Sequence, residues 1–392
     1  MNLWQKSKLG KFIDLLTGYS FKSDYYVESD PSIRLLRGDN VIQGSLRWNN
    51  AKRWPLLLSD GLEKYQMQEG DFVIAMDRTW VKSGLKATIV TKRDIPSLLV
   101  QRVARLRSKP GLNAYFLSLL IRGHKFEQYV KGVQTETAVP HISAKQIKEF
   151  PIVLPPLHEQ TAIADFLSTW DTAIEKIERL IAAKEKRFSC LRSRLINHEM
   201  VKGKWRRVKL EEVFSERVET QFRDLPLLSI TRKEGVIPRE DVNRKDTSNS
   251  DKSKYLRICT GDIGYNTMRM WQGVSALSKF EGIVSPAYTV CIPSNQLCGE
   301  FIAHYFKTPF LIHKFYRFSQ GLTSDTWNLK FKHFKEIRVA IPPLRQQKQI
   351  ASTLNTARQE IDLLKKQADA FRKQKRGLMQ KLLTGRWRMK VT

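Results

Sequence analysis

The sequence has no long apolar run and few cysteines. No stretch of about 18 apolar residues is available to span a bilayer, and the first twenty residues carry three lysines and an aspartate where a secretory signal needs unbroken apolar sequence. The four cysteines lack C-x-x-C spacing, which disfavours zinc sites and disulfides. We therefore expect a cytoplasmic protein with reduced thiols and no metal site.

Familiar catalytic motifs are also missing. No Asp or Glu is followed two positions later by Lys, as in many metal-dependent nucleases, and no two glycines are separated by one residue, so G-x-G-x-x-G is absent. Neither Gly-Lys pair is followed by the Ser or Thr of a P-loop, and the seven histidines form no H-E-x-x-H. Both Pro-Pro pairs lack the Asn/Asp-Pro-Pro-aromatic setting of a DNA amino-methyltransferase. We predict no catalytic residue, and these absences favour a binding subunit over an enzyme.

Acidic residues are scarce relative to basic ones. The chain has 68 Lys plus Arg against 39 Asp plus Glu, a net charge of +29 that is spread through the sequence. Such an excess predicts a polyanionic partner, and nucleic acid is favoured over a membrane surface because no basic amphipathic helix with an aromatic face stands out. With 41% hydrophobic and 10% aromatic residues among 392, the chain has enough apolar sequence for two or three folded domains.

The sequence contains an internal repeat. The string KEFPIVLPPLHEQ at 148–160 returns 187 positions later as KEIRVAIPPLRQQ at 335–347, each time before a helix-like tract. The pattern W-x3-K-L at Trp4 returns at Trp205. Four further matches share an offset of 191, namely Gly70 with Gly261, Asp71 with Asp262, Arg78 with Arg269 and Trp80 with Trp271. We predict two similar modules and two similar helices with approximate two-fold symmetry.

Each helical tract carries a heptad seam of apolar residues. The first seam contains Ile163, Leu167, Trp170, Ile174, Ile177, Ile181, Phe188, Leu191 and Leu195. The second contains Ile350, Leu354, Ile361, Leu364, Phe371, Leu378 and Leu382. Alternating steps of four and three that persist this long favour a coiled coil. Since neither stripe can be buried alone, we expect the two helices to pack together, antiparallel because the chain order is module, helix, module, helix.

Two lysines interrupt the seams. Lys184 and Lys375 stand at seam positions, where a buried polar residue can fix the register of a coiled coil. The alternative, which we favour for each lysine, is that its stem lies along the seam and its ammonium reaches solvent. The second tract is the more basic, with thirteen Lys or Arg against three Asp or Glu over 344–392, and is therefore the better candidate to lie near phosphate, although a basic helical face is often only solvated.

The two modules are predicted to be mixed α and β (α+β). Short β-rich runs at 72–75, 88–91, 282–292 and 337–341 are separated by Gly, Asn and Pro turns. The apolar spacing predicts one helix over Asn113–Tyr129 and one over Gly299–Phe318, followed by loops over 131–138 and 319–328. The predicted domains are a module at 1–154, a helix at 155–200, a module at 201–341 and a helix at 342–392.

Polar and basic residues in the predicted loops are the candidates for contacting DNA. In the first module they are Arg47, Trp48, Asn49, Lys52, Arg53, Arg78, Lys82, Gln134, Thr135 and Thr137. In the second module they are Arg244, Lys245, Lys252, Asn266, Arg269, Gln272, Thr323, Ser324 and Asn328. Arg and Lys can bind guanine edges, and Asn and Gln adenine edges, yet each residue taken singly is better explained by a phosphate contact or by solvation. Trp80 and Trp271 are either stacking platforms or core anchors.

Together these strings resemble the specificity subunit of type I restriction-modification enzymes of bacteria and archaea. The resemblance rests on tandem modules that each end in (V/A)-(L/I)-P-P-L-x-x-Q, on the heptad helices, and on GLMQKLLTGRW at 377–387. In the second module, MRMWQG at 268–273 and GIVSPAYTV at 282–290 resemble target recognition domains of this family. So do GDFVIA at 70–75 and LLVQRVARL at 98–106 in the first.

The resemblance implies a subunit without its own catalytic site or cofactor. Two target recognition domains would each read one half of a split, asymmetric site in double-stranded DNA, while the paired helices set the spacer and bind two methyltransferase subunits. Those partners would use S-adenosylmethionine for adenine N6 methylation, and a motor-nuclease subunit, if present, would use ATP and magnesium. Two alternatives remain: a DNA-binding architectural or adaptor protein that does not read sequence, and a self-contained enzyme with a degenerate site.

Overall fold

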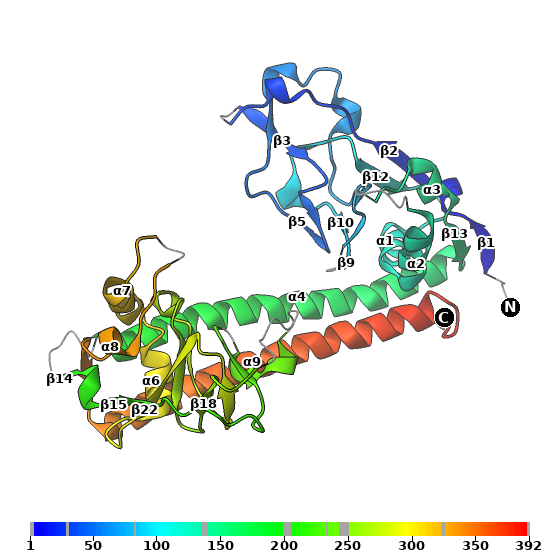
Figure 1. Cartoon of the computed structure of the whole chain (residues 1–392). Helices are drawn as coiled ribbons and strands as arrows, with labels where there is room; N and C mark the ends of the chain where they lie inside the picture. The colour runs from blue at the N-terminus through cyan, green and yellow to red at the C-terminus, as the bar shows by residue number, and fades with distance from the viewer. Residues whose placement is uncertain are drawn as a thin grey trace. The chain divides into compact units, whose positions relative to one another are not determined.

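The computed structural model describes residues 4–28, 31–81, 84–134, 140–198, 205–232, 234–242, 251–323 and 326–389. The chain forms two compact units (Figure 1). Unit 1 comprises Met1–Lys176 and Ala368–Thr392, and unit 2 comprises Ile177–Gln367. Two long helices, α4 (Leu157–Ser193) and α9 (Leu344–Leu382), each contribute one part to each unit. A short π-helix, Arg194–His198, continues α4. Within the described ranges, no helix is both long and apolar enough to cross a membrane.

Unit 1 is built on a four-stranded antiparallel sheet in the order β10-β7-β12-β2. Its strands are β2 (Ile13–Thr17), β7 (Phe72–Ala75), β10 (Ala87–Ile89) and β12 (Val103–Ser108). The predicted β-run at 72–75 is confirmed, and all four residues of β7 are buried because the sheet is covered on both faces. One face packs against the helices of the unit, which join Phe72, Phe116 and Ile163 in a single core.

The other elements of unit 1 form small sheets and helices around this core. The further strands are β1 (Gln5–Lys8), β3 (Ser32–Leu36), β4 (Val41–Ile42), β5 (Ser45–Leu46), β6 (Arg53–Pro55), β8 (Trp80–Val81), β9 (Gly84–Leu85), β11 (Ser97–Leu99) and β13 (Pro151–Leu154). The helices are α1 (Ala114–Arg122), α2 (His124–Val133) and α3 (Ala144–Glu149). Strand β1 pairs with β13, so the start of the module is fastened to the segment that leads into α4.

Unit 2 repeats this plan with the sheet order β15-β22-β19-β20. Its strands are β14 (Arg206–Lys209), β15 (Phe214–Glu216), β16 (Leu228–Thr231), β17 (Gly235–Pro238), β18 (Leu256–Ile258), β19 (Ile263–Asn266), β20 (Ser275–Leu277), β21 (Gly282–Val284), β22 (Tyr288–Pro293) and β23 (Arg338–Ile341). Its short helices are α6 (Gly299–Tyr305), α7 (Pro309–Phe318) and α8 (Phe331–Phe334). Strand β14 pairs with β23 as β1 pairs with β13. The internal repeat predicted from the sequence is therefore present in the fold.

The single helices predicted over Asn113–Tyr129 and Gly299–Phe318 were wrong, because each stretch holds two helices. Gly123 separates α1 from α2 in an extended conformation, and a Cβ there would lie 3.1 Å from the carbonyl oxygen of Leu119. Pro309 starts α7 afresh, with the Thr308 hydroxyl accepting a hydrogen bond from the backbone N–H of Leu311. Helix α2 also continues to Val133, so the predicted loop at 131–138 begins too early.

A buried glutamine explains the repeated P-P-L-x-x-Q string. The side chain of Gln160 accepts a hydrogen bond from the Asn113 N–H (3.0 Å) and donates to the carbonyls of Gly111 (3.0 Å) and Pro155 (2.9 Å). Gln347 does the same in unit 2, accepting from the Cys298 N–H (2.8 Å) and donating to the carbonyls of Gln296 (3.0 Å) and Pro342 (2.9 Å). Each glutamine thus fixes the start of a long helix to the loop that precedes α1 or α6.

In each unit, the segments of α4 and α9 lie against each other with opposite chain directions. In unit 1 the ring of Trp170 lies 5.6 Å from that of Phe371, and Leu167 shares the core with Leu382. In unit 2 an ion pair of 2.6 Å joins Lys184 to Glu360, and another of 2.6 Å joins Glu185 to Lys365. The seam residues Phe188, Leu191, Leu195, Ile350, Leu354 and Ile361 enter the core of unit 2.

The interpretation that the ammonium of a seam lysine reaches solvent was wrong for Lys375, whereas 26% of the Lys184 side chain is exposed. Lys375 is only 5% exposed and forms an ion pair with Asp171 across the helices of unit 1. Lys184 pairs with Glu360 in unit 2. Each ammonium is held by a carboxylate on the opposite helix, and Lys375 needs this partner because a buried cation without one costs several kcal/mol. Both residues therefore tie one helix to the other.

Candidate nucleic-acid interface

Three basic side chains converge on one side of unit 1. Arg47, which follows β5, and Arg78, which follows β7, are exposed. Lys86 lies between β9 and β10 and is half-buried. Burial lowers the pKa of Lys86, and the positive charges of Arg78 and Arg47 lower it further, against the attraction of Asp39 and Asp77. Sequence reasoning missed Lys86 because a lysine between two strand residues carries no local signal of the cations around it.

Other candidates of the first module have partners within it. The indole N–H of Trp48 donates to the Asp94 carboxylate at 2.7 Å, and the Arg34 guanidinium lies 4.4 Å from the centre of its ring. Arg53 donates from Nε to the Ser32 hydroxyl at 2.7 Å. Asn49 and Lys52 are exposed. Asn49 and Lys52 are thus accessible, whereas Trp48 and Arg53 also make hydrogen bonds within the module.

The two Arg-x-Trp strings lie in corresponding places but in different surroundings. Arg78 has a positive φ of 46°, and its backbone N–H donates to the Pro140 carbonyl at 2.7 Å. Trp80 packs against the core of unit 1 and has the Lys131 ammonium 4.4 Å from its ring centre. These contacts make Trp80 an anchor of its loop.

In unit 2 the corresponding turn combines an exposed arginine with an aromatic cluster. The Trp271 ring lies 5.1 Å from Trp327, which lies 4.9 Å from Tyr316. Asn266 shapes the turn, since its side-chain oxygen accepts the Met268 N–H at 3.0 Å. The described residues supply no hydrogen-bond acceptor or ion-pair partner for the Arg269 guanidinium, which is exposed. Arg269 is therefore available to an external acceptor.

The remaining candidates of unit 2 have differing accessibility. Asn328 donates to the carbonyls of Gln320 and Thr326, both at 3.1 Å, so its amide closes a loop. Thr323 is exposed and contacts Thr326, and Gln272 is half-buried. The Lys252 ammonium lies 4.8 Å from the ring centre of Tyr255.

Of the candidates in the loop after α2, only Gln134 lies within the described residues, where it is half-buried. The candidates that lie outside the described residues are Lys82, Thr135, Thr137, Arg244, Lys245 and Ser324. Across the described part of the chain, no group of three or more His, Cys, Asp or Glu is placed to hold a metal ion.

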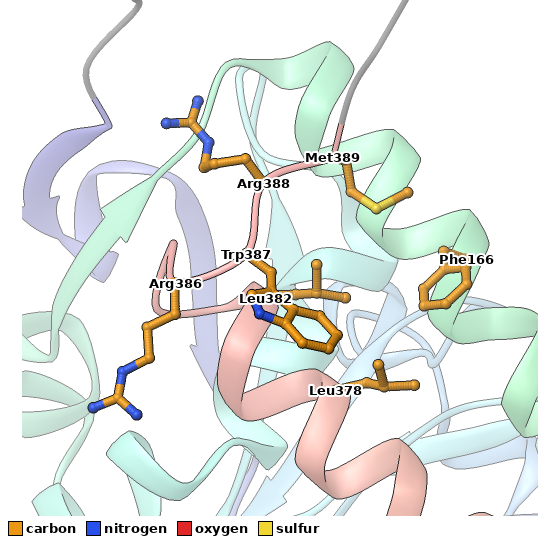
Figure 2. A pocket seen from close by; sticks show the side chains of 7 residues that line it. All are labelled: Phe166, Leu378, Leu382, Arg386, Trp387, Arg388 and Met389. Atoms are coloured by element: carbon orange, nitrogen blue, oxygen red, sulfur yellow. The ribbon is translucent and has the colours of Figure 1, made fainter.

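The end of α9 in unit 1 carries an open, largely apolar pocket of about 400 Å³. In Figure 2 the Trp387 ring and the Leu378 side chain point toward Phe166, whereas Arg386 points away. Arg388 binds the buried carboxylate of Glu159 through two hydrogen bonds of 2.7 Å. The Trp4 indole donates to the same carboxylate at 3.2 Å. Glu159 therefore fastens the segments around Trp4 and Arg388 to the start of α4.

Comparison with known proteins identifies the family from the sequence. The type I restriction modification DNA specificity domain matches residues 1–185 and again 202–370. The EcoAI specificity subunit of Escherichia coli is 32% identical over 178 residues, which are 45% of this chain and 29% of that protein. The MjaVIII specificity subunit of Methanocaldococcus jannaschii is 30% identical over 191 residues, which are 47% of this chain and 44% of that protein. The chain thus spans less than half the length of these two curated relatives.

A solved structure shares the fold over the whole chain. The crystal structure of the type I restriction-modification S subunit from M. genitalium has a TM-score of 0.58 and 14% sequence identity, and the match covers 100% of this chain and 98% of that one. At this identity the likeness concerns the fold alone. The two consecutive family matches, however, cover most of the sequence. The chain belongs to the type I restriction modification DNA specificity family.

Proposed function

We propose that this chain is the non-catalytic DNA-recognition subunit of a type I restriction-modification complex, acting in the cytoplasm. The observation that carries the proposal is the double family match, in which each segment holds one module and a large part of one long helix. The proposed domains are recognition modules at 1–154 and 201–341 and helices at 155–200 and 342–392.

Each module reads one half of a bipartite, asymmetric site in double-stranded DNA. The exposed cations support this role, because phosphate contacts position a protein on DNA while groups at base edges provide sequence specificity. Arg47 and Arg78 would serve the first module, and Arg269 the second. The modules place different side chains around corresponding turns, with a lysine over Trp80 and aromatic rings beside Trp271. Different surroundings favour two different half-sites.

The two long helices form an antiparallel coiled coil that sets the spacer between the half-sites. The contacts of Trp170 with Phe371 and of Lys184 with Glu360 support this arrangement. Helices of 37 and 39 residues are roughly 55 to 60 Å long at ~1.5 Å per residue. Half-sites approached from one face of DNA lie about one helical turn apart, ~34 to 36 Å, so a rigid pair of helices is long enough to measure the spacer.

The partners follow from this role. Two methyltransferase subunits dock on the helices and use S-adenosylmethionine to methylate adenine, and a motor-nuclease subunit, where one is produced, uses ATP and Mg²⁺. The chain itself needs no cofactor.

Co-expression with the neighbouring methyltransferase gene, followed by genome-wide mapping of modified adenines, tests the proposal. We expect one bipartite motif with a fixed spacer. The matched control expresses the methyltransferase without this chain and should yield no such motif. If the purified complex instead binds random and genomic duplexes equally, the chain is an architectural DNA-binding protein. Methyl transfer by the chain alone would show that it is an enzyme.

A further inference from the structure

A cluster of oppositely charged side chains lies between the helices of unit 1. The Asp171 carboxylate on α4 forms an ion pair with the Lys375 ammonium on α9 and accepts a hydrogen bond from the Tyr115 hydroxyl. The Arg122 guanidinium, at the end of α1, lies 3.8 Å from the same carboxylate. One half-buried acid thus faces two nearby cations. Removing it would leave uncompensated positive charge in a half-buried place.

The internal repeat places different residues at the corresponding positions of unit 2. The offset of 187 that relates the two P-P-L-x-x-Q strings takes Asp171 to Arg358 on α9. The same offset takes Phe188 on α4 to Lys375. The carboxylate of unit 1 is therefore replaced by a guanidinium, and the ammonium by an aromatic ring.

The third member of the cluster keeps its charge. Gln160 binds the backbone N–H of Asn113, and Gln347 binds that of Cys298, so these two positions correspond. Arg122 lies nine residues beyond Asn113, and Lys307 lies nine residues beyond Cys298. Unit 2 thus retains a cation here but lacks the acid that unit 1 sets against it.

Two arginines of unit 2 lie against the Phe188 ring. The guanidinium carbon of Arg358 lies 4.3 Å from the centre of the Phe188 ring, and that of Arg192 lies 5.9 Å from it. The Lys307 ammonium donates to the Arg232 carbonyl at 3.1 Å. Among the described residues, no carboxylate lies within ion-pair distance of Arg192, Arg358 or Lys307.

These cations act on one another. Burial lowers the pKa of Lys307 to about 8, and the charges of Arg232, Arg192 and Arg358 contribute to the shift. Burial, followed by repulsion from Arg358, also lowers the pKa of Arg192.

The neighbouring polar groups leave this charge uncompensated. His304, whose pKa is lowered chiefly by burial, hydrogen-bonds Asn355 at 2.8 Å. The nearby acid, Glu300, accepts a hydrogen bond from Asn355 at 2.8 Å. Glu300 is bound by Asn355 and forms no ion pair with Arg192, Arg358 or Lys307 among the described residues, so the cluster attracts an anion.

We propose that Arg192, Arg358 and Lys307 of unit 2, with Arg232 beside them, form a phosphate-binding site that supplies from outside the charge that Asp171 supplies in unit 1. Guanidinium groups match phosphate oxygens with paired N–H donors, and half-buried cations bind anions more strongly than fully hydrated ones. The phosphate comes from the DNA backbone or from free phosphate. The assignment of this phosphate to the DNA backbone rests on the proposed function.

The reactivity of Lys307 tests the site in the full-length protein. Limited acetylation near pH 8, followed by peptide mass spectrometry, gives the acetylation rate of Lys307, which depends on the fraction of its amine that is unprotonated. The exposed Lys348 is the reference lysine in the same sample. Near pH 8 about half of the Lys307 amine is free, and a bound phosphate that raises its pKa by about one unit lowers the acetylation rate about fivefold. Inorganic phosphate and a duplex carrying the mapped site are the two probes, at constant ionic strength. Arg358→Asp, which installs the carboxylate of unit 1, should abolish the protection and keep the fold.

A salt titration identifies the source of the phosphate. For Arg192→Gln/Arg358→Gln we expect the slope of log affinity against log salt to fall by about 0.9 for each DNA phosphate that the variant no longer binds. Arg187→Gln/Arg345→Gln removes two exposed arginines from the same two helices and is the matched control.

The outcomes separate as follows. Protection of Lys307 by phosphate, with a slope that falls only in the test variant, supports the site with DNA as source. Protection by phosphate with equal slopes supports it with free phosphate as source. Absence of protection by either probe overturns the proposal, as does protection that requires the methyltransferase, which indicates an acidic protein surface. The wild-type preference for specific over random duplex, measured in the same titration, tests the proposed function independently.

Discussion

Two buried aspartates hold corresponding turns, one in each unit. Asp71 follows Gly70 and Asp262 follows Gly261, and both glycines have positive φ, at 88° and 96°. The carboxylate of Asp71 accepts two hydrogen bonds from Arg107, and that of Asp262 accepts two from Arg217. The repeated Gly-Asp string therefore encodes a turn and a buried ion pair, which are structural features of the modules.

Asp262→Asn should destabilise unit 2 by about 3 kcal/mol, because the substitution leaves the Arg217 guanidinium, 14% exposed, without its principal anion. Denaturant unfolding followed by tryptophan fluorescence measures the loss. Glu281→Gln, which breaks the more exposed pair with Arg257, is the control and should cost much less than Asp262→Asn. Equal losses in the two variants would contradict the buried-pair interpretation.

Glu159 makes unit 1 sensitive to acid. Burial by itself raises the pKa of Glu159, but the hydrogen bonds from Arg388 and Trp4 outweigh it and bring the pKa below its ordinary value. Because the folded pKa is the lower one, the ionised group stabilises the fold at neutral pH. This contribution is lost as the pH falls below about 4.5 and through the folded pKa. Thermal midpoints across this range should fall less steeply for Glu159→Gln than for the wild type. Parallel curves would refute the assignment.

Arg269→Ala should weaken binding to one half-site selectively, by about 1 to 3 kcal/mol if its guanidinium contacts a base edge at two points. The side chain is exposed and has no competing partner among the described residues. Competition between duplexes altered in one half-site measures the effect. Lys279→Ala, at another exposed cation of unit 2, is the control. A uniform loss on all sequences would assign Arg269 to a phosphate instead.

Among the secondary-structure elements, the two apolar seams could be predicted because heptad spacing is visible in the sequence of each helix by itself. The buried pair of Lys375 with Asp171 was not readable, since it depends on which residue of the other helix lies opposite. The breaks at Gly123 and Pro309 were overlooked in favour of apolar spacing, although both residues signal a helix boundary. Local patterns therefore predicted the two long helices, whereas the ion pair between them depends on tertiary contacts that no local pattern indicates.

A heptad inserted in both helices should lengthen the spacer of the recognised site and leave both half-sites unchanged. The seam is preserved by such an insertion, because seven residues keep the apolar stripe on the same face. Mapping of modified adenines measures the spacer. The control inserts two residues in each helix, which rotates the stripe by about 200° and should abolish activity. An unchanged spacer after the heptad insertion would mean that the helices do not set it.

At the scale of the whole molecule, duplication was the strongest sequence signal. It predicted two modules of the same plan, and the sheets β10-β7-β12-β2 and β20-β19-β22-β15 have that plan. The candidate site was less predictable, because accessibility depends on neighbours distant in sequence. Trp48 is hydrogen-bonded to Asp94, whereas Lys86, which no pattern marked, lies near Arg47 and Arg78.

Replacing residues 1–154 with the corresponding module of a relative should change one half of the methylated site and retain the other half and the spacer. The expectation follows because each unit has its own core and its own exposed cations. The mapped motif of the hybrid is the measurement, and the reciprocal replacement of 201–341 is its control. Loss of both halves would mean that the modules do not read DNA independently.

The division of the chain into units also has a consequence for biosynthesis. Unit 2 is a single uninterrupted stretch, whereas unit 1 needs Leu382 for its core and Arg388 for the carboxylate of Glu159. A nascent polypeptide leaving the ribosome therefore possesses every part of the second unit before it possesses every part of the first. Unit 1, whose translation begins first, is therefore completed only after Arg388 has been added to the chain.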